Sequence, residues 1–556
     1  MRRQRSARPK HRTVKLSVTV KRRLEHKYGA KLQQIDTAIQ AWIDADAKER
    51  SIYTVHVAVD DPAEMHQVWR DYFPRARPVR PVSGKVTARK IKRAIDDLWN
   101  RLSPDYLVLF GGHDIVPMFE VDNPSNFLSS PPVVDRDRKL TTDNPYASSK
   151  VFRPGDVGSY LVPDRVTGRI PDMMHSRDPT WFVEYLKTAT CWEPKPVSFY
   201  RETYAICSSE MTTAGRDSMR YLSKPVSDLL ISPPVRDIRR SSRNRLSARL
   251  HLIKCHGNPL DATFWGKGKR FVRAITSATL KAHLKPATLI GTMCCYGAQI
   301  FSPHAKHARS HGRWPIASTY LRKGALGFVG STRMAWLGQG AMGSADWIVA
   351  DYLSRVLEGA SIGRAFLESK QKFAGYYTAK GRVLDRKKEK TMIEYVLLGD
   401  PSVQPVDPSI HPRWRRVAGP ESDLVPQERR QRRMVLSRRA EQICKLLPRR
   451  THATSAQRTM AKKVFKRAQR AFWKDDVIKL KQFRIKSAVV CVEKVNTPLY
   501  IAPETRTNLG AIPNRQSLQF YWGGKRLRDG QTQICLITAE TDLKGNVLRT
   551  SVGYSS

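Results

Sequence analysis

Two apolar runs in this sequence end in residues that could carry out covalent chemistry. The run at 249–257, RLHLIKCHG, leads to His256, and the run at 286–295, PATLIGTMCC, ends in Cys294 and Cys295. Both runs are typical of buried strands. Because the carboxyl ends of strands in an open parallel sheet meet at one crevice, we expect the histidine and a cysteine to face each other there. A thiolate beside an imidazole is the arrangement used in nucleophilic cysteine catalysis.

Glycines accompany both of these run ends. Gly257 directly follows the histidine, and Gly297 follows the cysteine pair. A glycine allows a tight turn and lets backbone amides come close to an oxyanion. A single buried cysteine is usually an inert small hydrophobe. The placement of the histidine and the cysteines together is what favours a catalytic pair.

The segments around these residues predict an α/β fold. A strand-like run at 53–59 precedes a helical pattern at 84–103, and an apolar run at 105–112 then ends in two glycines. This order favours a parallel sheet with helices on its faces. Residues 15–50 have a mostly helical pattern. Further buried strands are expected within 202–210 and 323–332, and further helix within 343–373.

Changes in composition divide the chain into six expected segments. These are a disordered basic arm at 1–13, a helical and α/β subdomain at 14–185, a catalytic α/β domain at 186–408, a Pro- and Arg-rich linker at 409–433, a basic helical region at 434–480, and a small all-β domain at 481–556.

The chain carries a large surplus of positive charge. It has 98 Lys and Arg against 50 Asp and Glu, a formal net charge of +48 and a sequence pI near 10.3. Such a charge attracts polyanions such as nucleic acid. The surplus is spread along the chain, which equally fits a generally basic composition. Both interpretations stay open.

The eight cysteines show neither metal-ligand spacing nor a paired framework, so we expect no zinc site and no disulfide scaffold. No apolar run approaches the ~20 residues that a membrane-spanning helix needs. The basic N-terminus lacks the apolar stretch of a secretory signal. We therefore expect a cytoplasmic protein without a transmembrane segment.

The motifs together resemble the caspase, legumain and gingipain group of cysteine peptidases, and the gingipain family most of all. Six segments carry this resemblance: LVLFGGHDIVP (107–117), YLVPDRVTGRIPD (160–172), CHGNPLDATFWG (255–266), MCCYGAQIF (293–301), KGALGFVGSTRMAW (323–336) and EYVLLGDPSV (394–403). The resemblance implies a caspase-like parallel-sheet sandwich and cysteine endopeptidase activity on a protein or peptide substrate. It implies no metal ion or organic cofactor in the reaction.

The family's functional residues map onto this sequence one by one. His256 matches the catalytic imidazole, and the Cys-x-x-Gly register selects Cys294 as nucleophile, with Cys295 as the alternative. The carboxylate that orients the histidine matches Asp164. The backbone amides of Gly257 and Cys294 match the oxyanion donors.

The loop expected to line the substrate pocket, 332–346, carries Arg333 and Trp336 and has no acidic residue before Asp346. We expect Trp336 to form an apolar wall. Arg333 would favour an acidic or neutral side chain at the cleavage site, although a solvent-facing arginine is the simpler interpretation.

Two features depart from the family's pattern. Met293 precedes the nucleophile and Lys254-Cys255 precede the histidine, where small residues are common. Neither change removes a catalytic group. The basic composition also fits a function of another class: a catalytically silent caspase-like scaffold that binds nucleic acid or another polyanion through its basic C-terminal region.

Overall fold

The computed structural model describes residues 13–407, apart from 75, 127–128, 131–132, 175, 238–244, 260, 301–313, 339 and 380–383, together with four strands near the C-terminus. The chain divides into two compact units, Met1–Asp423 and Leu424–Ser556. None of the helices within the described residues combines the length and the apolar character needed to cross a bilayer.

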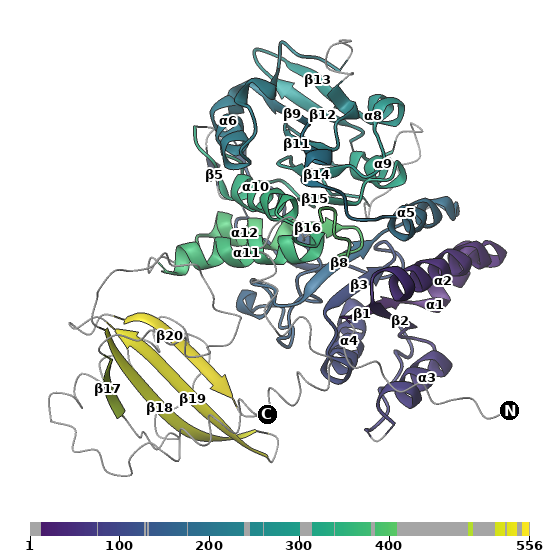
Figure 1. Cartoon of the computed structure of the whole chain (residues 1–556), viewed down its shortest axis with the longest axis vertical. Coiled ribbons are helices and arrows are strands. Elements are labelled where there is room, and N and C mark those ends of the chain that lie inside the picture. Colours follow the sequence, from purple (N-terminus) through teal and green to yellow (C-terminus); the bar gives the residue numbers. More distant parts are fainter. Residues whose placement is uncertain are drawn as a thin grey trace. The chain divides into compact units, whose positions relative to one another are not determined.

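A ten-stranded sheet organises the first unit, in the order β10-β9-β11-β14-β15-β16-β8-β3-β1-β2 (Figure 1). Every neighbouring pair is parallel except β15 and β16, which are antiparallel. The sheet therefore consists of two parallel blocks that run in opposite directions. The carboxyl ends of the first block lie at the same edge as the amino ends of the second.

The strands of the two blocks come from different parts of the chain. The first block contains β9 (Thr203–Ser208), β10 (Leu229–Ser232), β11 (Leu250–Lys254), β14 (Leu289–Thr292) and β15 (Gly327–Ser331). The second contains β1 (Thr13–Thr19), β2 (Ile52–Ala58), β3 (Tyr106–Phe110), β8 (Val166–Ile170) and β16 (Tyr395–Leu398). The predicted α/β class with a mostly parallel sheet is confirmed.

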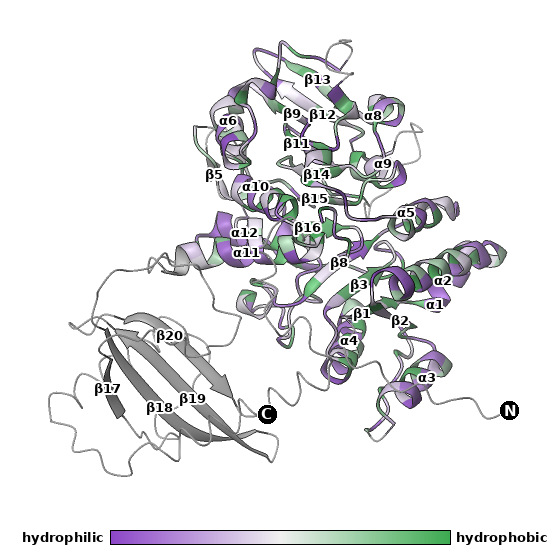
Figure 2. Cartoon of the chain, in the orientation of Figure 1, coloured by the Kyte–Doolittle hydropathy of each residue, from purple (hydrophilic) through white to green (hydrophobic). Residues whose placement is uncertain are grey.

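Helices connect the strands and cover the sheet. They are α1 (Lys21–Tyr28), α2 (Leu32–Glu49), α3 (Pro62–Tyr72), α4 (Ala88–Leu102), α5 (Thr180–Thr190), α6 (Thr212–Tyr221), α8 (Ser277–His283), α9 (Ile316–Arg322), α10 (Ser344–Leu357), α11 (Ile362–Ala379) and α12 (Arg386–Glu394). Hydrophobic residues concentrate on the strands and on the helix faces turned towards them (Figure 2).

The first block is buried on both faces, because successive side chains of a strand point to opposite sides. Ile253, Ile290 and Phe328 belong to one apolar core, which includes residues of α5, α8 and α9. Their neighbours Leu252, Leu289 and Val329 belong to a second core, which includes residues of α10 and α11. Burial on both faces explains why these strands are continuous apolar runs in the sequence.

The prediction of a mostly helical segment at 15–50 is wrong at its start. Thr13–Thr19 forms β1, which pairs with both β2 and β3. Lys15, the third residue of β1, is fully buried, and its ammonium group lies 2.5 Å from Asp46 and 2.7 Å from Asp400. Asp46 lies in α2 and Asp400 lies 385 residues further along the chain. The ion pairs that allow a buried lysine are therefore not visible in the local sequence, whose mixture of charged and apolar residues is typical of a helix.

Two antiparallel hairpins extend from the sheet. One pairs β4 (Phe119–Asp122) with β7 (Lys139–Thr142), and the other pairs β12 (Thr263–Lys267) with β13 (Phe271–Thr276). A third, shorter pair joins β5 (Ser129–Ser130) to β6 (Val133–Val134). The second hairpin directly follows the expected histidine, so it is the one that bears on the site.

The second unit contains an antiparallel sheet in the order β17 (Ala488–Val492), β18 (Ser517–Arg528), β19 (Gln531–Thr541) and β20 (Val547–Tyr554). The expected arm, linker and basic helical region, at 1–13, 409–433 and 434–480, lie almost wholly outside the described residues; residue 13 opens β1.

Candidate active site

His256 stands just beyond β11 and is fixed by the hairpin that follows it. Its amide donates to the carbonyl of Trp265 at 2.8 Å, and the Trp265 amide donates back at the same distance. The imidazole is about a quarter exposed and packs edge-on against Phe271, with ring centroids 5.2 Å apart. The hairpin therefore holds the histidine backbone while its ring remains reachable from solvent.

A carboxylate that the sequence analysis missed contacts this histidine. Glu210 follows β9 and accepts a hydrogen bond from His256 Nε2 at 2.7 Å. Its other carboxylate oxygen lies 3.3 Å from the ammonium group of Lys267. With the proton on Nε2, the Nδ1 atom of the ring keeps its lone pair and can accept a proton.

Burial lowers the pKa of His256 from its usual value, and Lys267 lowers it further. Glu210 acts in the opposite direction, through its hydrogen bond and its charge. Burial is the largest of these effects. The imidazole is therefore neutral at neutral pH, which is the form required of a general base.

Asp164, the expected orienting carboxylate, does not meet His256. It lies just before β8 and accepts hydrogen bonds from the amide and hydroxyl of Ser149. Three strands separate β8 from β11. At about 4.8 Å per strand, the two residues lie roughly 19 Å apart along the sheet edge. Asp164 precedes a strand of the second block, whereas His256 follows a strand of the first block. Because the strand direction reverses between β15 and β16, both residues lie at the same edge of the sheet but far apart along it. The prediction that Asp164 orients His256 was therefore wrong.

A sequence signal for Glu210 does exist. The run ETYAICSSE at 202–210 ends in this residue, just as the neighbouring run leads to His256. The two strands pair in parallel with Cys207 beside Lys254, so residues a few positions further along leave the sheet together. An acidic residue at the end of an adjacent buried strand was therefore the better candidate.

The two adjacent cysteines point in different directions. Cys294 is fully buried, and its sulfur accepts a hydrogen bond from the Cys255 amide at 3.3 Å. Cys295 is partly exposed, and its sulfur accepts from the Ala335 amide at 3.4 Å. Access to a substrate carbonyl therefore favours the alternative nucleophile, Cys295, over the choice made from the Cys-x-x-Gly register.

Burial raises the pKa of both thiols. For Cys295 it raises the pKa to about 11, with the negative charges of Glu394 and Asp137 adding to the effect and the Ala335 amide opposing it. For Cys294 burial also raises the pKa strongly. Both groups are thus protonated at neutral pH, so a base must remove the proton as either sulfur attacks.

The backbone of the histidine segment touches that of the cysteine segment. A side-chain carbon at Gly257 would collide with the carbonyl oxygen of Cys295. Tyr296 then adopts a left-handed conformation with φ of 56°, and its amide donates to the Arg333 carbonyl at 2.8 Å. Only glycine permits this approach at 257. The assignment of oxyanion donors to Gly257 and Cys294 stays a prediction.

The expected pocket residue Arg333 borders the same turn. Its carbonyl accepts from the Tyr296 amide, and its side chain is partly buried. Within the described residues the Nε atom of Arg333 has no hydrogen-bond partner. The neighbouring amide of Met334 donates to Asp137 at 2.9 Å, and the Tyr296 hydroxyl donates to the same carboxylate at 3.1 Å. Asp137 is thus a second charged group at this wall that the sequence analysis missed.

Trp336, which we expected to form an apolar wall of the pocket, contacts other side chains through its indole N–H and through the face of its ring. Its indole N–H donates to the Ser125 hydroxyl at 3.2 Å, and the ammonium group of Lys387 lies 4.0 Å from the ring centre. Behind this wall, Lys390 is fully buried and lies 2.7 Å from Asp135. The segment around Ser125–Asp137 therefore supports the loop that follows β15.

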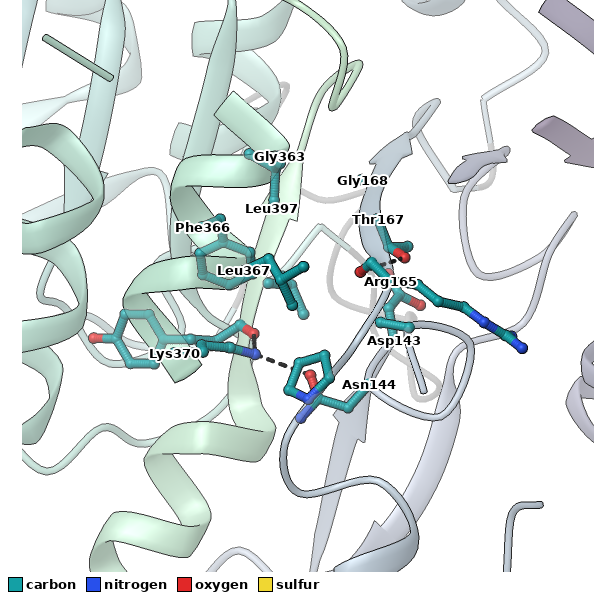
Figure 3. A pocket seen from close by; sticks show the side chains of 14 residues that line it. Asp143, Asn144, Arg165, Thr167, Gly168, Gly363, Phe366, Leu367, Lys370 and Leu397 are labelled. Atoms are coloured by element: carbon teal, nitrogen blue, oxygen red, sulfur yellow. Dashed lines mark hydrogen bonds between the residues drawn. The ribbon is translucent and has the colours of Figure 1, made fainter. Parts of the chain in front are cut away.

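A small cavity lies away from these residues, at the seam between β8 and β16 (Figure 3). Its volume is about 30 Å³, which suits one or two water molecules and no peptide. Lys370 lies beside it and donates to Asn144 at 2.9 Å and to the Tyr395 carbonyl at 2.7 Å. Burial lowers the pKa of this lysine to about 7.

Within the described part of the chain, no three His, Cys, Asp or Glu side chains are grouped so that they could hold a metal ion. The strand tips carry a thiol, an imidazole and the carboxylate hydrogen-bonded to it, which is the set that cysteine hydrolases use.

Part of the chain is similar to a known family of peptidases. Residues 33–174 match peptidase family C25, and these residues include the supporting segment around Ser125–Asp137. No curated protein matches the chain. A solved structure described as a protease matches with 16% identity and a TM-score of 0.45, covering 71% of this chain and 78% of its own.

The chain is therefore a cysteine-type endopeptidase by class. Residues 33–174 carry a peptidase family C25 domain, as the gingipain resemblance predicted. The matched residues end before His256, Cys294 and Cys295, so the roles of these three rest on geometry.

Proposed function

We propose that this protein cleaves peptide bonds with Cys295 as nucleophile, His256 as general base and acid, and Glu210 as the group that orients the imidazole. The observation that carries the proposal is the 2.7 Å hydrogen bond between Glu210 and His256 Nε2, with Gly257 packed on the Cys295 carbonyl. Within a caspase-like sandwich, these groups belong to three adjacent strand ends, those of β9, β11 and β14.

The reaction follows from the resting protonation states. His256 Nδ1 takes the proton of the Cys295 thiol as the sulfur bonds to the substrate carbonyl carbon. The tetrahedral oxyanion then collapses, the C–N bond breaks, and the imidazolium returns the proton to the leaving amine. Water, deprotonated by the same imidazole, hydrolyses the thioester and restores the thiol. Glu210 stabilises the imidazolium in both halves of the cycle.

The nucleophile is tested by a pair of substitutions at neighbouring positions. Wild type, Cys295→Ala and Cys294→Ala are incubated with a mixed-sequence peptide library, and cleavage is followed by mass spectrometry. We expect Cys295→Ala to abolish cleavage and Cys294→Ala to retain it. The reverse result, with unchanged melting temperatures, would return the role to Cys294. Failure of all three proteins to cleave any peptide would favour the silent scaffold.

Cleavage-site preference is a second part of the proposal. Asp137 is already engaged by Tyr296 and Met334, whereas no carboxylate among the described residues lies within ion-pairing distance of the Arg333 guanidinium group, whose Nε atom is buried and has no hydrogen-bond partner. The guanidinium group is therefore the charge left to pair with a substrate, which favours an acidic or neutral side chain before the scissile bond.

Peptides that differ only in Arg, Lys, Asp or Leu at this position measure the preference directly. The Arg333→Gln protein should lose any preference for Asp while it still cleaves the Leu peptide. A strict preference of the wild type for Arg or Lys would contradict this part of the proposal and leave the nucleophile assignment untouched.

A further inference from the structure

A second cavity, of about 300 Å³, lies among α5, α8 and α9, on helices that do not carry the candidate active site. Its volume is at the lower end of the range for small-molecule sites. The lining combines cationic, aromatic, hydroxyl and acidic side chains: Thr180, Glu184, Lys281, Trp314, Arg322 and Lys323.

Aromatic rings hold two of the cations in place. The guanidinium group of Arg322 lies 4.5 Å from the ring centres of both Trp181 and Trp314, and it also lies 3.3 Å from Asp178. The ammonium group of Lys281 lies 3.3 Å from the Trp314 ring centre. Contacts of this kind restrict long side chains that would otherwise move freely in solvent.

The cavity has more positive than negative charge. No carboxylate lies within ion-pairing distance of Lys281 or Lys323 among the residues that the structure describes, and Asp178 offsets only Arg322. Burial lowers the pKa of Lys281, and the charges of Arg322 and Lys323 lower it further. An anion between these lysines would relieve the repulsion among the three cations.

Glu184 sets a further requirement on the occupant. Glu184 lines the cavity, and its carboxylate would repel a bare anion. A carboxylate is, however, the usual acceptor for ribose hydroxyls in nucleotide sites. A ligand that suits both ends of the cavity therefore carries an anionic group for the lysines and hydroxyl donors for the acid.

We propose that this cavity binds a nucleoside phosphate, with the phosphate between Lys281 and Lys323 and the sugar hydroxyls on Glu184. This binding site is separate from the peptidase chemistry, so it would be present in a protein whose nucleophile had been removed.

The test measures binding of adenosine monophosphate to the full-length protein by isothermal titration calorimetry at low ionic strength. Inorganic phosphate and adenosine are titrated in parallel. We expect saturable binding of one equivalent of the nucleotide, weakened about tenfold or more by Lys281→Ala, because a hydrogen bond to a charged group is lost.

Further variants separate the proposed contacts from loss of packing. Lys323→Ala removes a charge without disturbing the stack on Trp314 and should also weaken nucleotide binding. Glu184→Ala should weaken the nucleotide but not inorganic phosphate. Lys195→Ala is the matched control, because that lysine also lies near a tryptophan, 5.8 Å from Trp192, outside this cavity. It should leave the affinity unchanged.

Two results would overturn the proposal. Equal nucleotide affinity in Lys281→Ala, Lys323→Ala and wild type would place any binding elsewhere on this basic chain. Inorganic phosphate binding as tightly as the nucleotide, with no effect of Glu184→Ala, would refute the assignment to a nucleoside.

Discussion

Replacement of Glu210 by glutamine tests the arrangement of the active site most directly. The substitution keeps the shape of the side chain and removes its charge from the 2.7 Å contact with His256. A hydrogen bond to a charged group contributes about 1.5–3 kcal/mol. Both side chains are 28% exposed, so solvent screens the pair and the lower part of that range applies. A loss of about 1.5–2 kcal/mol corresponds to about a 10- to 30-fold fall in kcat/KM.

The same substitution should move the pH profile in a defined direction. The Glu210 carboxylate raises the pKa of His256 against the stronger effect of burial. Its removal therefore lowers the pKa of the imidazole, and the acidic limb of kcat/KM against pH moves to lower pH. A purely structural defect would lower activity at every pH without this movement.

The assay is hydrolysis of one fluorogenic peptide, taken from the cleavage library, across the pH range. Asp164→Asn is the matched control, because Asp164 was the carboxylate expected from the sequence and its side chain contacts Ser149 instead. We expect this control to change kcat/KM less than about twofold. A large loss in Asp164→Asn together with an unchanged Glu210→Gln protein would refute the assignment.

Three further predictions concern packing and buried charge. Gly257→Ala should abolish cleavage and lower the free energy of unfolding by about 1–3 kcal/mol, because the new methyl group collides with the Cys295 carbonyl; full activity would contradict the close approach of the two backbones. Lys15→Met should cost about 3–5 kcal/mol, measured by urea unfolding, because it removes the ammonium group shared by two buried carboxylates and leaves Asp400 without an ion-pair partner among the described residues; a neutral effect would show that the Asp400 carboxylate is protonated in the variant. Burial lowers the pKa of His251 to about 4, so the unfolded chain binds a proton that the folded chain does not, and stability should fall by about 3 kcal/mol between pH 6.5 and 4. The His251→Gln protein should lose that part of the pH dependence of its melting temperature, and an unchanged slope would contradict the prediction.

Some of the candidate site could be predicted because it depends on short segments. Apolar runs that end in His256 and in the cysteine pair are visible in the sequence, and a buried parallel strand must be apolar on both faces. Such runs predict the strands and the edge at which they end. The family C25 match at 33–174 likewise agrees with motifs that are local in sequence.

The choice of partners could not be predicted in the same way. Asp164 and Glu210 are both acidic residues next to strands, and only the order β9-β11-β14-β15-β16-β8 puts one beside the histidine and the other four strand spacings away. Strand order depends on which faces pack together, and no local pattern encodes it. The antiparallel pairing of β15 with β16 is decisive here.

The two cysteines differ for a similar reason. Their sequence neighbours are almost the same, so a register drawn from a motif cannot show which thiol reaches solvent. In the folded chain, Cys294 packs into the core with Ile253, whereas Cys295 turns towards the Ala335 amide. Which side of a strand end faces solvent is set by the helices and loops that cover it.

The sequence alone indicated the α/β class and predicted that His256 and the cysteine pair stand at strand ends, because residue type and apolar run length act locally, and the resemblance to gingipains implied the peptidase chemistry. The tertiary structure decided which carboxylate meets the histidine, which thiol is accessible, and that Asp137 joins the wall near Arg333 from a segment almost 200 residues away. Those outcomes depend on strand order and on burial, and both arise only when distant segments pack together.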